Sequence, residues 1–164
     1  MKTTACPGCG AVLPVFDGPT HPYMESSPAC WSTYTEVLAR EYSNPALLAG
    51  IHRTTVDTYA VQHPGKPSSQ SIQSVAVHLM SLCLMLERDA PPAFATEAIR
   101  AAVARKGDFV WLKPPASLGP ITVVDVAGTS GAAAHEGAVR AWSQSAWEAW
   151  APHHAEVRAW IDRL

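Results

Sequence analysis

Apolar residues recur at helical spacing over most of the chain, and this pattern predicts a mainly α fold. Trp31, Tyr34 and Leu38 share one face of the first predicted helix. Ser27 is suited to cap the start of this helix, and Pro28 suits its first position. The same reasoning predicts further helices over residues 45–62, 69–88 and 91–107, and helical structure again over 132–164.

Two stretches lack the helical period. Residues 1–30 are rich in proline, glycine and cysteine, which predicts an irregular lobe. Residues 108–127 contain the short β-type runs "FVWL" and "ITVVDV", which predict extended segments that could pair as a small β ribbon. We therefore expect one domain over residues 1–164, a bundle of about five helices. Its parts are an N-terminal lobe (1–30), helices (31–107), extended segments (108–127) and C-terminal helices (132–164).

Composition and charge exclude several classes of protein. The chain has 164 residues, of which 48% are hydrophobic, and this proportion excludes bulk disorder. Its formal net charge is −2 and its 12 basic residues are scattered, so we expect no nucleic-acid partner. The longest apolar run, "SVAVHLMSLCLML", is too short to span a bilayer, and no secretory signal follows Met1. We therefore expect no membrane association and a cytoplasmic location.

The N-terminal cysteines have the spacing of metal ligands. Cys6 and Cys9 form a C-x2-C pair, and the glycine between them permits the tight turn of a zinc half-site. His21 and Cys30 are the nearest residues that could complete a tetrahedral site. We predict that this zinc is a structural staple, because the lobe has too few apolar residues to fold unaided. Cys83 lies in an apolar helix and is predicted to be a small core residue.

Two other interpretations of the cysteines stay open. A redox-active C-x2-C pair is disfavoured, because such pairs sit between a strand and a helix of a βαβ unit that the sequence does not predict. Free thiols without a ligand are the remaining alternative.

A second group of polar residues lies in the predicted bundle. His78 and His154 share helix faces with apolar residues, so both should point inward, where polar groups need partners. With Asp57 and His63 they could hold a second divalent metal, such as Zn²⁺, Fe²⁺, Mn²⁺ or Ni²⁺, in an open site. Gln62 could orient a small molecule there. The alternative is that each histidine is hydrogen-bonded separately in the core.

Several strings resemble a bacterial family catalogued as domain of unknown function 5946. They are "CPGCGA", "GPTHPYMESSPACW", "VLAREYSNP", "VDTYAVQHPG", "SVAVHL" and "WEAWAPHHAEVRAW". The resemblance implies no activity, but it marks eight residues: Cys6, Cys9, His21, Cys30, Asp57, Gln62, His63 and His78. A looser resemblance links the chain to DinB/YfiT-type bundles, which bind a divalent metal through three histidines. That resemblance implies a second metal, although the ligand spacing here differs from theirs.

Two functions follow from these patterns. The first is a metal-binding protein with a structural zinc and a second His/Asp site that acts on a small molecule. The alternative is a non-enzymatic binding or adaptor domain, in which zinc is purely structural and the histidines belong to the core. The sequence leaves open whether His21 belongs to the cysteine site or to the histidine site.

Overall fold

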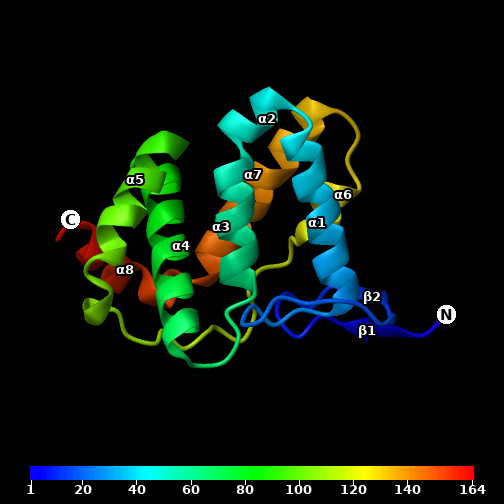
Figure 1. The fold of residues 1–164 in the computed structure, drawn as a ribbon, viewed down its shortest axis with the longest axis horizontal. Helices are drawn as coiled ribbons and strands as arrows, with labels where there is room; N and C mark the ends of the chain where they lie inside the picture. The colour runs from blue at the N-terminus through cyan, green and yellow to red at the C-terminus, as the bar shows by residue number, and fades with distance from the viewer.

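The computed structural model describes residues 1–164 and confirms the mainly α fold with a small β ribbon (Figure 1). There are eight α-helices rather than about five, because the chain includes several short ones. The elements are β1 (Thr3–Ala5), β2 (Val12–Pro14), α1 (Pro28–Tyr42), α2 (Pro45–Gly50), α3 (His52–Gln62), α4 (Ser69–Glu87), α5 (Pro92–Val103), α6 (Val123–Ala127), α7 (Ala132–Ala149) and α8 (His154–Ile161), with 3-10 turns at Lys106–Asp108 and Ala151–His153.

Local capping explains where the helices begin. The Ser27 hydroxyl accepts a hydrogen bond from the backbone N–H of Cys30, and Pro28 occupies the first turn of α1, as predicted. The side chains of Asn44 and Ser68 cap α2 and α4 in the same way. The helix predicted over residues 45–62 is broken at Ile51, whose backbone leaves the helical region between α2 and α3.

Two apolar clusters form the core. One lies among α4, α5, α8 and the end of α7, and the other among α1, α3, α6 and the start of α7. Helices α3 and α7 contribute to both, through Tyr59 and Val61 on α3 and through Trp142 and Trp147 on α7. Figure 1 shows α3 and α4 in the middle of the molecule, with the N-terminal strands at one end and the C-terminus at the other.

The β ribbon lies in the N-terminal lobe, and residues 108–127 contain no strand. β1 and β2 pair antiparallel, with Ala5 opposite Val12. In the run "ITVVDV", Thr122 and Asp125 form a capping box that starts α6 instead. β-branched residues favour strands only weakly, and here two local hydrogen bonds outweigh that preference.

Helix α4 is long and apolar enough to cross a membrane by length and composition, with a mean hydropathy of 1.3 over 18 residues. However, 56% of that window is buried within the fold. The helix packs against α3, α5, α7 and α8, which are the contacts of a core helix.

Candidate metal centre

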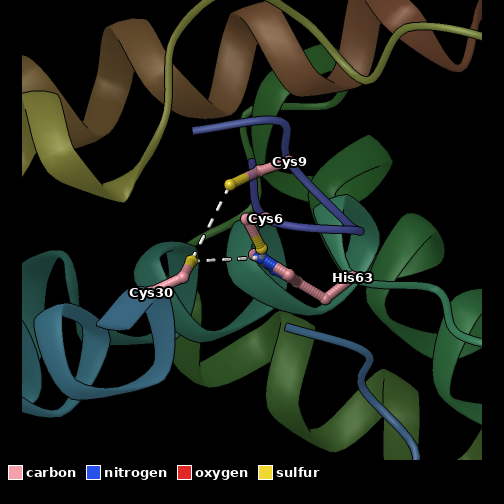
Figure 2. Close-up of side chains that lie close together, drawn as sticks. All are labelled: Cys6, Cys9, Cys30 and His63. Atoms are coloured by element: carbon pink, nitrogen blue, oxygen red, sulfur yellow. Dashed lines mark hydrogen bonds between the residues drawn. The ribbon is translucent and has the colours of Figure 1, made fainter. Parts of the chain in front are cut away.

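A tight turn between β1 and β2 carries the first two cysteines. The N–H of Cys6 donates to the carbonyl of Ala11 at 2.8 Å, and the N–H of Gly10 donates to the carbonyl of Cys6 at 3.0 Å. Gly10 has a φ of +78°, which glycine adopts without strain. This turn presents the thiols of Cys6 and Cys9 on the same side of the hairpin (Figure 2).

Two helix ends supply the other members of the cluster. Cys30 lies in the first turn of α1, where the Ser27 cap holds its backbone. His63 follows the last residue of α3 and leaves the helical conformation. One ligand atom from each of Cys6, Cys9, Cys30 and His63 lies within 4.8 Å of every other, and we call these residues the Cys3His cluster (Figure 2).

The distances in the Cys3His cluster fit a tetrahedral zinc ion. Cys9 Sγ and Cys30 Sγ are 3.7 Å apart, and His63 Nε2 lies 3.5 Å from Cys6 Sγ and 3.4 Å from Cys30 Sγ. Zinc bonds of about 2.3 Å to sulfur and about 2.0 Å to nitrogen give a regular tetrahedron edges of about 3.8 Å between sulfurs and about 3.5 Å between sulfur and nitrogen. These three distances match the edges of such a tetrahedron, and the other pairs of donor atoms lie within 4.8 Å of each other.

The same distances exclude a disulfide. All cysteines of the chain are free. A disulfide would bring two sulfurs to about 2.05 Å, far closer than the sulfurs of Cys9 and Cys30. The C-x2-C pair is thus neither bridged within itself nor to Cys30.

The ring of His63 is oriented for ligation. Its Nδ1–H donates to the carbonyl oxygen of Tyr59 at 2.7 Å, so Nε2 carries the lone pair that faces the sulfurs. The ring also stacks on Tyr59, with centroids 3.9 Å apart, and Tyr59 stacks on Tyr34 at 3.8 Å. A hydrogen bond from the other ring nitrogen to a carbonyl is the usual support of a metal-bound histidine.

Hydrogen bonds also reach the buried sulfurs. The backbone N–H of Ser27 points to Cys6 Sγ at 3.4 Å, and the Tyr59 hydroxyl points to Cys30 Sγ at 3.6 Å. Such donors stabilise thiolates. Cys6 and Cys30 are buried, whereas Cys9 is partly exposed.

Ionisation of one thiol in the cluster opposes ionisation of the other two. The pKa of Cys6 is lowered far below its usual range by the thiols of Cys30 and Cys9, which hydrogen-bond to it. The pKa of Cys30 is strongly raised by its hydrogen bonds to Cys6 and Cys9 and by burial. One negative charge is therefore favoured and further charges are opposed, and a divalent cation would offset that repulsion.

Substituting Gly8 tests the cluster without removing a ligand. A Cβ on Gly8 would lie 2.4 Å from Cδ2 of His63 and 2.7 Å from the carbonyl oxygen of Gln62. We expect Gly8→Ala to displace His63 and to reduce the zinc content of the purified protein. Gly137→Ala is the control, because Gly137 is an exposed residue of α7 with nothing within 4 Å of the added Cβ. That variant should keep its zinc and gain up to about 1 kcal/mol in stability. Equal zinc in both variants would contradict the prediction.

His21 lies outside the Cys3His cluster, and His63 takes the place that the sequence suggested for it. The Nδ1 atom of His21 accepts hydrogen bonds from the backbone N–H groups of Tyr23 at 3.3 Å and Met24 at 3.2 Å. Its ring packs against Trp31. These contacts hold the His21 ring in the local turn, outside the Cys3His cluster.

Asp57 and His78 do lie together, between α3 and α4. The buried carboxylate of Asp57 accepts a hydrogen bond from His78 Nδ1 at 2.7 Å and from Arg53 Nε at 3.0 Å to both oxygens. The Ser81 hydroxyl donates to the second oxygen. These donors saturate the carboxylate, so Asp57 has no free lone pair directed at a metal.

The other residues proposed for a second metal site are not part of this group. His63 belongs to the Cys3His cluster. His154 donates from Nε2 to the carbonyl of Trp147 at 2.8 Å and stacks on that indole with centroids 3.8 Å apart. The four-residue site expected from the sequence is therefore not assembled.

Gln62 anchors a loop rather than a ligand. Its amide nitrogen donates to the carbonyls of Leu118 at 2.9 Å and Ile121 at 2.8 Å. Its amide oxygen accepts from the indole of Trp142 at 2.7 Å. Both donors and the acceptor are thus used within the protein, and they tie the segment before α6 to the bundle.

A buried carboxylate that no sequence motif predicted joins α1, α3 and α7. Glu41 is fully buried, and it accepts hydrogen bonds from His52 Nδ1 at 2.7 Å, from His135 Nε2 at 2.8 Å and from the Thr55 hydroxyl. A sequence signal existed, because Glu41 lies seven residues after Tyr34 and so falls on the apolar face of its helix. A charged residue at such a position needs partners from other elements.

Comparison with known proteins places this chain in a family but assigns it no activity. No curated protein and no solved structure matches it, so the looser resemblance to DinB/YfiT bundles is not confirmed. A family model described as Family of unknown function (DUF5946) matches residues 4–151, a range that includes every residue of the Cys3His cluster. The chain therefore belongs to the DUF5946 family, as its motifs predicted.

Proposed function

We propose that this is a zinc-binding protein in which a single structural zinc fastens the N-terminal hairpin to the helical bundle. The observation that carries the proposal is the tetrahedral spacing of the sulfur and nitrogen atoms in the Cys3His cluster. Four protein ligands leave no open position for water or substrate, which is the pattern of structural sites.

The weakness of the hairpin by itself supports a structural role. β1 and β2 are three residues each, and most of their residues are exposed. A two-stranded hairpin of this kind is at best marginally stable in water. The cluster joins it to the start of α1 and to the end of α3, so an ion there would replace the apolar core that the lobe lacks.

Elemental analysis of protein purified without a histidine tag or chelator tests the proposal. We expect one zinc per chain, and we expect Co²⁺ to replace it with the absorption bands of a tetrahedral thiolate site. Protein that folds fully without metal and takes up neither ion would contradict the proposal. A Co²⁺ spectrum without sulfur-to-metal charge transfer would contradict the ligand assignment.

A further inference from the structure

A cavity of about 620 Å³ lies along α4, beside the Asp57–His78 pair. We call it the α4 cavity. Its size is that of a site for a small metabolite. Its polar lining residues include Tyr23, Gln70, Gln73, Ser74, His78 and Lys106. No aspartate or glutamate lines it, and Lys106 carries the one permanent charge on its wall.

The His78 ring has a nitrogen available for a ligand. Nδ1 donates to the buried carboxylate of Asp57 at 2.7 Å, which sets the tautomer and leaves Nε2 without a partner in the protein. Arg53 from α3 also bonds Asp57, so the positive charge of Arg53 offsets the negative charge of the carboxylate next to the His78 ring. His78 is therefore held rigidly, as an orienting carboxylate holds a functional histidine.

Ser74 supplies a second polar group beside His78. Its side chain lines the α4 cavity, and its hydroxyl is open to the cavity and makes no hydrogen bond within the protein. It precedes His78 by four residues on α4, so the two side chains are neighbours on one helix face. The Ser74 hydroxyl is therefore available to a ligand in the cavity.

We propose that the α4 cavity binds a small molecule that carries a carboxylate or phosphate group, recognised by His78, Ser74 and Lys106. Lys106 and the Ser74 hydroxyl donate to the anionic group, and Nε2 of His78 contacts the ligand beside them. The charged and titratable groups around His78 are Asp57 and Arg53 from α3, Lys106 from the turn after α5 and Tyr23 from the lobe. Lys106 attracts the anion electrostatically, and no acidic residue on the cavity wall opposes this attraction.

This inference does not rest on the zinc proposal. The two meet at one point, because Tyr23 lies in the segment between Cys9 and Cys30 and forms part of the cavity wall. Zinc content is therefore measured on each sample, so that loss of metal and loss of anion binding are read separately.

The test titrates the full chain with inorganic phosphate and, separately, with acetate, using NMR at constant ionic strength. We expect a saturable shift of the amide signals of Ser74 and Gln73 and of the ring signals of His78. Whichever anion binds more tightly identifies the group that the site prefers. Lys106→Ala should weaken binding about 10-fold or more, since it removes a charged partner.

Lys113→Ala is the matched control, because Lys113 is exposed and does not line the α4 cavity. It should bind phosphate as the unmodified chain does. Shifts that fail to saturate with both anions, equal weakening in the two lysine variants, or saturable binding that leaves the His78 signals unchanged would each overturn the proposal.

Discussion

Replacing Cys30 with alanine is expected to abolish zinc binding and to lower the melting temperature. Cys30 is fully buried, and its sulfur lies 3.4 Å from His63 Nε2 and 3.7 Å from Cys9 Sγ. Structural zinc sites in zinc-finger peptides contribute on the order of 10 kcal/mol of binding free energy. Loss of the ion would remove the main stabilising contribution to the lobe, while the bundle keeps its own apolar core.

The measurements are zinc content, thermal unfolding and limited proteolysis. Cleavage should appear within residues 1–27 first, because this segment depends on the cluster. Cys83→Ala is the matched control, since Cys83 is also free and fully buried but lies in the apolar core of α4. The control should keep its zinc. If Cys30→Ala also retained one zinc per chain, or if both variants lost it equally, the structural role of the cluster would be refuted.

Replacing Glu41 with alanine is expected to cost about 3 kcal/mol or more of folding free energy. The substitution removes the acceptor shared by His52, His135 and Thr55, and it leaves Nε2 of His135 buried without a partner. Nδ1 of His135 already has none. Removing one partner from a buried polar network costs more folding free energy than the intact network contributes. The reason is that the remaining polar groups stay buried without hydrogen bonds.

Urea unfolding measures this cost, provided that the slope of the unfolding free energy against urea concentration is the same in the variant and the unmodified chain. Glu136→Ala is the control, because Glu136 is 43% exposed and pairs with Arg140 one turn away on α7. An exposed ion pair of this kind contributes at most about 1 kcal/mol. Similar losses in the two glutamate variants would show that the Glu41 network is not the stabilising feature described above.

Local signals in the sequence located most of the helices and the first half of the metal centre. The Ser27 cap with Pro28, and the cap at Ser68, act through hydrogen bonds within one turn, so neighbouring residues suffice to predict them. The pairing of Cys6 with Cys9 is likewise a property of one turn. The same kind of signal misled over residues 108–127, where β-branched residues suggested a strand and a capping box produced α6.

Only the tertiary structure decided which residues complete each cluster. His63 stands 57 residues from Cys6, and His135 stands 94 residues from Glu41. No pattern along the chain brings such residues together, because their distance depends on how α1, α3 and α7 pack. Proximity in sequence favoured His21, but hydrogen bonds from Tyr23 and Met24 to its Nδ1 hold the ring in a local turn outside the cluster. The sequence alone thus determined most of the helices and the residue types able to bind a metal. The packing of the bundle determined which of these residues meet, because side chains far apart in the sequence become partners only where the packed helices bring them close together.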